Sequence, residues 1–251
     1  MSTYQVSKAK LRVSNIKKNF GNMEIINDVS FYANENEFIS LLGPSGSGKS
    51  TIFNIISGLM HQDSGEIIID GQECKNTLEK VSYMHQKDLL LPWKNILDNT
   101  ILSLLIKGKS KKQARAEAIN YFKAFGLNGF EYKYPHQLSG GMKQRAALLR
   151  TYMSSPNIML LDEPFGALDA ITRAKMQYWL IEMIKELKAT IIFITHDIEE
   201  AVFLSDRIYV LSDKPATIKK EIIVDLPKIR TKDIVTSEKF NEIKRCILQT
   251  L

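Results

Sequence analysis

The sequence predicts an α/β fold built around a mostly parallel β-sheet, and two observations favour it. Short apolar segments alternate with longer segments of helical periodicity, most clearly in the last part of the chain. Several of the apolar segments are hydrophobic at nearly every position, which is typical of strands that are covered on both faces. We expect strands at residues 11–16, 29–33, 38–42, 67–69, 81–84, 158–161, 190–195 and 207–211, and helices that begin near Lys49 and Asp197 or span 170–187.

The middle of the chain has a different character. Residues 110–125 begin with a capping-box pattern, Ser110 and Gln113, and continue with apolar residues on one helical face. Gly126 follows as a stop signal. We therefore expect residues 93–137 to form a helical insert between the strands.

Composition limits the class of protein. The 251 residues are 44% hydrophobic and 25% charged, which excludes collagen-like, disordered and disulfide-scaffold proteins and suits one large domain. The start of the chain has no apolar leader, and apolar stretches such as 101–106 are too short to span a membrane. We therefore expect a soluble, cytoplasmic protein. The net charge of +6 would suit nucleic acid, an anionic membrane or a nucleotide, and favours none of them.

A glycine-rich loop follows the predicted strand 38–42 and precedes a predicted helix. It matches the P-loop pattern G-x-x-x-x-G-K-[ST] in the strand–loop–helix context that this pattern requires. Backbone N–H groups of such a loop surround phosphate oxygens, and the positive end of the helix faces them. The alternative is a Gly/Ser loop with a chance lysine. We expect Lys49 on the β- and γ-phosphates and Ser50 on Mg²⁺; the nucleotide-binding residues are Gly43, Pro44, Ser45, Gly46, Ser47, Gly48, Lys49, Ser50 and Thr51.

The apolar strand 158–161 ends in two carboxylates. Asp162 lies at the end of the strand, where it can hold Mg²⁺ through water, and Glu163 lies one residue further on, where it can polarise an attacking water. An Asp-Glu-Pro turn without chemistry is the alternative, which the P-loop upstream makes less favourable.

A third motif, LSGGMKQR at residues 138–145, precedes this strand. Ser139, Gly140 and Gly141 offer a hydroxyl and open backbone N–H groups at a helix N-terminus, a second anion site in one chain; a plain Gly-Gly loop is the alternative. Together the three motifs resemble those of the ATP-binding cassette (ABC) transporter ATPases.

The resemblance implies an architecture and an assembly. It implies a P-loop NTPase core with an N-terminal antiparallel β subdomain, a helical signature subdomain at 93–155 and a short C-terminal extension at 218–251, all within a single ABC ATPase domain, 1–251. It also implies a head-to-tail homodimer that binds ATP and Mg²⁺ between the P-loop of one copy and the signature of the other.

Four further residues match the family by position. Gln86 resembles the Q-loop glutamine, which contacts Mg²⁺ or the water, so Ser50, Gln86 and Asp162 are the implied metal residues. Asp169 resembles the D-loop aspartate at the dimer interface, although by itself it predicts a helix N-cap. His196 resembles the switch histidine that contacts the γ-phosphate, and a structural histidine is the alternative.

Phe20 resembles the aromatic residue that stacks on adenine, and an ordinary core phenylalanine is the alternative. The sequence departs from the family pattern twice: Phe20 stands where tyrosine is common, and Met142 stands where many members have glutamine. Phe20 would keep the stacking and lose the hydroxyl, whereas a contact from the Met142 side chain is in doubt.

Partners follow from the resemblance and from one apolar loop. Residues 88–94, DLLLPWK, are strongly apolar for a predicted loop, and we expect Leu91, Pro92 and Trp93 to help dock a transmembrane permease subunit. A buried anchor for the helical insert is the alternative for Trp93. The basic residues within 107–115 favour a solvated surface over nucleic acid.

The resemblance is greatest to importer ATPases of the nitrate, sulfonate and taurine type, whose relatives also serve uptake of thiamine precursors. It implies a position on the cytoplasmic face of the membrane, beside a permease and, indirectly, a substrate-binding protein. The competing class is a non-transport ABC ATPase that acts on nucleic acid or ribosomes. Such proteins carry a long coiled coil or two cassettes, for which this chain has no room.

Overall fold

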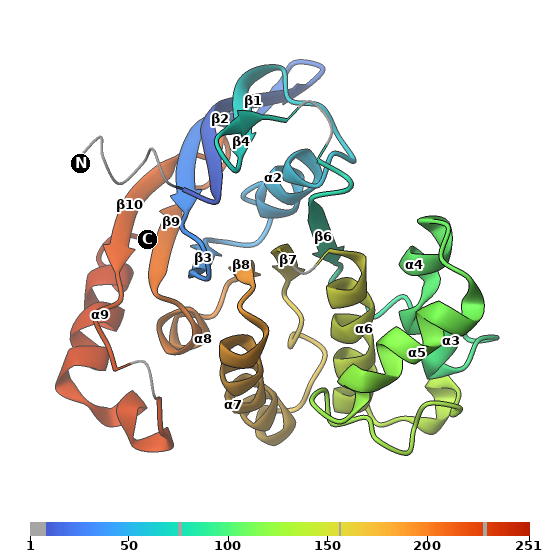
Figure 1. Ribbon diagram of the computed structural model, residues 1–251. Helices are drawn as coiled ribbons and strands as arrows, with labels where there is room; N and C mark the ends of the chain where they lie inside the picture. The colour runs from blue at the N-terminus through green and yellow to red at the C-terminus, as the bar shows by residue number, and fades with distance from the viewer. Residues whose placement is uncertain (1–8, 75–76, 156, 228–229) are drawn as a thin grey trace.

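The chain forms two β-sheets with helices between and beside them (Figure 1). The computed structural model describes residues 9–74, 77–155, 157–227 and 230–251. The N-terminal sheet has the strand order β2-β1-β4-β5 and is antiparallel. Its strands are β1 (Leu11–Phe20), β2 (Met23–Ala33), β4 (Ser64–Ile69) and β5 (Gln72–Glu73). The predicted strands 11–16, 29–33 and 67–69 are all present, and each is longer than the apolar pattern indicated.

The central sheet has the order β10-β9-β3-β8-β7-β6, with only the edge strand β10 antiparallel to its neighbour. Its strands are β3 (Phe38–Leu42), β6 (Val81–Met84), β7 (Ile158–Asp162), β8 (Thr190–Thr195), β9 (Arg207–Leu211) and β10 (Ile218–Ile223). The predicted mostly parallel sheet is therefore confirmed. β3 joins elements far apart in sequence, because it pairs with both β8 and β9.

Alternate side chains of the central strands enter two different hydrophobic cores. Ile39 and Leu41 of β3 pack in the core beneath the N-terminal sheet, together with helix α2 (Lys49–Ile56). Leu42 of the same strand packs in the other core, against α7 (Ala170–Leu187) and α8 (Ile198–Leu204). Burial on both faces explains why these strands are apolar at nearly every position.

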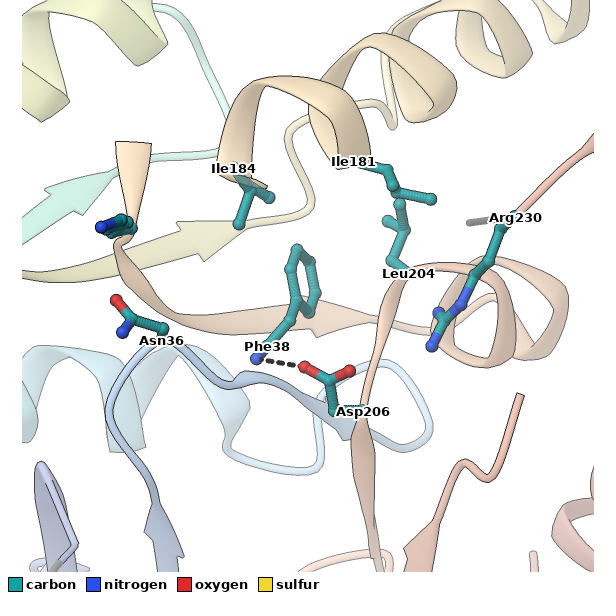
Figure 2. Close-up of a pocket in the computed structure, with 8 residues that line it drawn as sticks. Asn36, Phe38, Ile181, Ile184, Leu204, Asp206 and Arg230 are labelled. Carbon is teal, nitrogen blue, oxygen red and sulfur yellow. Dashed lines mark hydrogen bonds between the residues drawn. The ribbon is translucent and has the colours of Figure 1, made fainter. Parts of the chain in front are cut away.

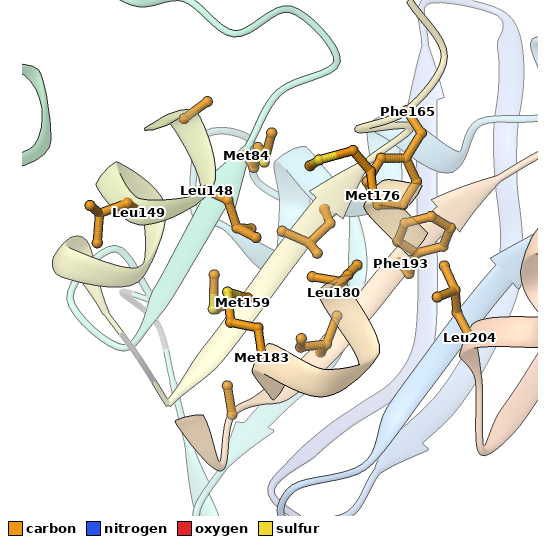
Figure 3. Packing of buried hydrophobic residues seen from close by; sticks show 14 of the residues in the cluster. Met84, Leu148, Leu149, Met159, Phe165, Met176, Leu180, Met183, Phe193 and Leu204 are labelled. Atoms are coloured by element: carbon orange, nitrogen blue, oxygen red, sulfur yellow. The ribbon is translucent and has the colours of Figure 1, made fainter. Parts of the chain in front are cut away.

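The larger core also includes the helical part of the chain. Figure 3 shows Leu148 of α6 (Gly140–Ser154) and Leu180 of α7 in one cluster with Met159 and Phe193 of the sheet. Buried residues of α3 (Ile96–Thr100), α4 (Leu102–Ile106) and α5 (Lys111–Phe122) belong to the same cluster. The helical part lies beside the β6 edge of the sheet and shares its core (Figure 1).

The predicted helix at 110–125 begins as expected and ends earlier. Ser110 caps α5, and its capping box with Gln113 is present. The helix ends at Phe122, and the next residues form a turn in which the Leu127 N–H donates to Phe122 O at 2.8 Å. Gly126 has φ 65° within this turn, a backbone conformation that glycine adopts without strain.

Residues after β10 pack on α8 at the opposite edge. A short 3-10 segment, η2 (Lys232–Thr236), leads into α9 (Glu238–Leu248), whose Phe240 and Ile247 are buried. Arg230 is buried, and its guanidinium donates to Val202 O and to Ser205 O, at 3.3 and 2.6 Å, at the end of α8. Figure 2 shows Arg230 at one end of a cavity of about 290 Å³, with apolar residues of α7, α8 and β3 along it.

Candidate functional site

The site lies where the parallel strands of the central sheet end. In parallel sheets the carboxyl ends of neighbouring strands meet at one edge, which is the usual position of ligand sites in α/β proteins. The loop after β3 holds Lys49, β7 ends in Asp162, and the loops after β6 and β8 carry Gln86 and His196. Residues separated by more than 140 positions in the sequence are thus brought to one edge.

The P-loop wraps around the N-terminus of α2. Gly46 and Gly48 have φ 79° and 107°, which a residue with a side chain rarely adopts. A Cβ atom on Gly48 would also lie 3.2 Å from Ile25 Cγ2, so glycine permits the loop to pack against β2. The Lys49 ammonium donates to Gly43 O at 2.8 Å and to Pro44 O at 2.7 Å. Burial lowers the pKa of Lys49, and the carboxylates of Glu163 and Asp162 oppose that shift.

Asp162 is held from two sides. Its Oδ2 accepts hydrogen bonds from Ser50 Oγ and from Tyr83 Oη, both at 3.0 Å. Burial raises the pKa of Asp162, and these two hydrogen bonds oppose the rise. The predicted pair Ser50 and Asp162 is therefore in direct contact. Tyr83 was not predicted as a site residue.

Glu163 connects two neighbouring loops. Its Oε1 lies 2.9 Å from His196 Nδ1, and its Oε2 accepts a hydrogen bond from Gln86 Nε2 at 3.2 Å. Its φ of 43° is unusual for a residue with a side chain, and such strain concentrates at functional sites. The structure thus brings together the three residues predicted to be catalytic.

One open cavity of about 560 Å³ joins most of these residues to the N-terminal sheet. The P-loop, Asp162, Glu163 and Gln86 line it from the edge of the central sheet, and Phe20 lines it from the end of β1 in the N-terminal sheet. Phe20 is 48% exposed, so the alternative of an ordinary core phenylalanine is wrong. The cavity is also lined by four residues that were not predicted: Met23, Ile25, Ile194 and Lys214.

The donor groups fit a nucleotide with a magnesium ion. The backbone N–H groups of the glycine-rich loop and the Lys49 ammonium are complementary to phosphates. The side chains of Phe20, Met23 and Ile25 offer an apolar surface to a base. Among the described residues no group of three or more His, Cys, Asp or Glu side chains could hold a metal ion. A hydroxyl and one carboxylate, Ser50 and Asp162, suit Mg²⁺, which takes most of its other ligands from phosphates and water.

The third motif lies outside this cavity. Ser139 caps α6 by accepting a hydrogen bond from the Met142 N–H at 3.3 Å, and Ser139 and Gly140 are exposed. A Cβ on Gly141 would lie 3.1 Å from Thr172 Cγ2, so this glycine also permits α6 to pack closely on α7. Neither Ser139 nor the two glycines line the P-loop cavity.

Asp169 lies near this motif, at the start of α7. Its carboxylate accepts from the N–H groups of Ile171 and Thr172 at 3.1 and 3.0 Å, so the predicted N-cap is confirmed. The backbone hydrogen bond from Thr172 lowers the pKa of Asp169. A role of Asp169 at a dimer interface stays a prediction.

Comparison with known proteins identifies the family. The profile of the family described as "ABC transporter" matches residues 26–166, more than half of the chain. The chain belongs to the ABC transporter family. The matched residues include the P-loop, Gln86, Ser139, Asp162 and Glu163.

Relatives in this family cover most of the chain. An aliphatic sulfonates import ATP-binding protein, SsuB of Bacillus cereus, is 41% identical over 92% of this chain and 90% of its own length. The formylaminopyrimidine import ATP-binding protein ThiZ of Halalkalibacterium halodurans is 45% identical over 87% of this chain and 84% of its own length.

A solved ABC cassette has the same fold. The structure of the ATP-binding cassette MJ0796 as a dimer, in a post-hydrolysis state bound to ADP and Pi, superimposes with a TM-score of 0.72 at 30% identity. The match covers 86% of this chain and 100% of the MJ0796 chain. The predicted ABC fold is confirmed, and so is the predicted function at the level of the family: this chain is an ATP-binding, ATP-hydrolysing ABC transporter subunit. No helix within the described ranges is both long enough and apolar enough to cross a membrane.

Proposed function

We propose that this chain powers an ABC importer for a small organic molecule by binding and hydrolysing Mg²⁺–ATP as a head-to-tail dimer. The observation that carries the proposal is the position of Glu163. Its carboxylate belongs to a residue that lines the P-loop cavity, and it is held by Gln86 on one side and His196 on the other. A carboxylate held in that position suits a general base for the water that attacks the γ-phosphate.

The chain's own residues then have separable roles. The loop that surrounds the phosphates is formed by Gly43, Pro44, Ser45, Gly46, Ser47 and Gly48. Thr51 adds the first turn of α2, and Lys49 neutralises the charge of the phosphates. Ser50 and Asp162, with Gln86 near them, would hold Mg²⁺, which stabilises charge on the transferred phosphoryl group when it is bound. Glu163 accepts the proton of the attacking water, and His196 orients the carboxylate.

The exposed third motif supports the dimer. Ser139 and Gly140 present a hydroxyl and a helix N-terminus to the outside, away from the chain's own P-loop cavity. A second copy that offers its own phosphates to this position would complete two identical sites. The helical subdomain, which we assign to 93–155, carries this surface, and Asp169 lies beside it at the start of α7.

The loop at 88–94 supports docking to a permease. Trp93 is 72% exposed and Pro92 is exposed, so the alternative of Trp93 as a buried anchor is wrong. Two side chains outside the loop fix its backbone. Asn99 Oδ1 accepts from the Leu91 N–H at 2.7 Å, and Arg150 donates to Asp88 O at 2.6 Å. A firmly held apolar side chain at the surface suits a helix of a membrane subunit.

The importer and its cargo class are inferred from the relatives. The names of SsuB and ThiZ describe import of aliphatic sulfonates and of a formylaminopyrimidine. We infer that this chain serves uptake of a comparable small organic molecule, at the cytoplasmic face of the membrane. Transmembrane subunits and a substrate-binding protein, not the ATPase, would select the cargo.

Co-purification from the native cell tests the proposal. The tagged chain, isolated in detergent, should retain a polytopic membrane protein and hydrolyse ATP only when Mg²⁺ is present. The Lys49→Ala variant should retain the membrane protein and lose ATP binding. A ribosome or DNA partner in place of the membrane protein would overturn the importer assignment, and Mg²⁺-independent turnover would overturn the assigned chemistry.

A further inference from the structure

The segment after β9 forms part of the nucleotide cavity, although none of the three motifs includes it. The Ala216 N–H donates to Ile25 O at 2.8 Å, and Ala216 O accepts from the Asn27 N–H at 2.9 Å. This pairing attaches Ala216, two residues after Lys214, to β2, the strand that packs against the P-loop. A Cβ on Gly48 would lie 3.7 Å from Ala216 Cβ, so the segment lies directly beside the P-loop.

The turn is also fixed internally. Ser212 Oγ donates to Pro215 O at 3.0 Å and accepts from the Thr217 N–H at 2.9 Å. Lys214 therefore lies in a turn that is fixed by hydrogen bonds of the residues that follow it, Pro215, Ala216 and Thr217. Its side chain lines the cavity, is exposed, and makes no hydrogen bond or ion pair with any residue in the described part of the chain.

We propose that Lys214 is a nucleotide-contacting residue whose ammonium group binds the α-phosphate of ATP and ADP. This proposal rests on the proposed ATP site. Lys214 adds a cation to the cavity from a segment outside the P-loop, and it determines how tightly both substrate and product are held.

The position of Lys214 along the cavity selects the α-phosphate. Phe20 and Ile25 line the cavity from the N-terminal sheet and suit the base, whereas Gln86 and Glu163 line it from the loops after β6 and β7 and suit the terminal phosphate. Lys214 belongs to the segment that contacts both Ile25 and the P-loop at Gly48. Lys49 is assigned to the β- and γ-phosphates, which leaves the α-phosphate, the one nearest the base, for the Lys214 ammonium. The ammonium pairs with it as a point charge.

Nucleotide affinity of a charge-neutral variant tests the proposal. We expect Lys214→Met to weaken binding of both ADP and ATP by about fivefold, the size of a partly exposed ion pair, and Lys214→Arg to restore most of it. Raising NaCl from about 50 to about 500 mM should weaken ADP binding less in Lys214→Met than in the wild type, because one screened pair is gone. Adenosine, which has no phosphate, should bind both proteins equally.

Lys112→Met is the matched control, since Lys112 is exposed on α5, far from the cavity, and its loss changes the net charge equally. Equal ADP affinity of Lys214→Met and Lys112→Met would overturn the proposal. So would a loss of adenosine affinity in Lys214→Met, which would place the lysine on the base. If the wild type itself bound no ATP, the proposed function would fail, and that result is distinguishable from either of these.

Discussion

Glu163 Oε1 lies 2.9 Å from His196 Nδ1, and this contact joins the ends of the neighbouring strands β7 and β8. The other oxygen of the same carboxylate accepts from Gln86 Nε2, which follows β6. Since the two partners approach from opposite sides, the carboxylate has one defined position above the P-loop. A general base must first be correctly placed relative to the proton that it accepts.

Replacing Glu163 by glutamine should separate ATP binding from hydrolysis. Glutamine keeps the size of the side chain but cannot accept the proton of water, so we expect phosphate release to fall by about 10²–10⁴-fold. ATP affinity should stay within about twofold, and the variant should accumulate as an ATP-bound dimer. Phosphate release and light scattering with Mg²⁺–ATP measure both effects.

Glu73→Gln is the control, because Glu73 is exposed on the short edge strand β5. It should hydrolyse ATP at the wild-type rate and dissociate after turnover. Wild-type turnover by Glu163→Gln would remove Glu163 from the role of the base.

Replacing His196 by alanine should slow hydrolysis through Glu163. Without its partner on the β8 side, the carboxylate is positioned by Gln86 alone, and we expect the rate to fall by about 10–100-fold while ATP affinity changes little. Single-turnover phosphate release measures the chemical step. His136→Ala, which removes an exposed histidine stacked on Tyr134, is the control. Parallel losses in both variants would show a general effect on the protein and contradict the assignment.

Glu200 gives a prediction about stability and pH. Burial raises the pKa of Glu200, although hydrogen bonds from Thr195 and Gln177 oppose the rise. The native state therefore holds this proton more tightly than the unfolded chain. The contribution of Glu200 to stability is fully present below the unfolded pKa of about 4.5 and is lost as pH rises through the native pKa.

Glu200→Gln should accordingly be more stable than the wild type at pH 7, because glutamine carries no buried charge. Its Oε1 can accept from Gln177 Nε2, and its Nε2 can donate to Thr195 Oγ1 in place of accepting from it. The difference in melting temperature should shrink as the pH is lowered toward 4. Glu199→Gln is the neighbouring control, since Glu199 is exposed and pairs with Lys244. A lower melting temperature of Glu200→Gln at pH 7 would show that the charged form is favoured in the native state.

The elements that the sequence predicted well are those with strong local signals. Segments that are apolar at most positions predicted β3 and β8 to the residue, and the Ser110 and Gln113 pair predicted the start of α5. The P-loop motif predicted the start of α2 at Lys49. Each signal reflects burial or capping within a few residues, so no long-range information was required.

The residues that were missed depend on the fold. Tyr83 reaches Asp162 only because β6 pairs with β7 across 77 positions, from Val81↔Ile158 onwards. Lys214 joins the nucleotide cavity only because the segment after β9 pairs with β2. A search of every loop that follows a predicted parallel strand, at the edge where those loops meet, would have included Lys214. The position of Trp93 likewise depends on Asn99, whose side chain bonds to the backbone of Leu91 and Lys94 on either side of it.

Trp93→Ala tests that loop as a docking surface. Because Trp93 is exposed and held on a fixed turn, its removal should leave the isolated ATPase unchanged in stability and in ATP affinity. In the complete transporter reconstituted in vesicles, we expect transport to fall by at least about fivefold, since a central exposed aromatic residue commonly dominates an interface. Ile106→Ala is the control, because Ile106 is 87% exposed on the same helical part, at the end of α4. Equal transport by both variants would exclude Trp93 from the permease contact, whereas a loss confined to Trp93→Ala would place the contact on the loop at 88–94.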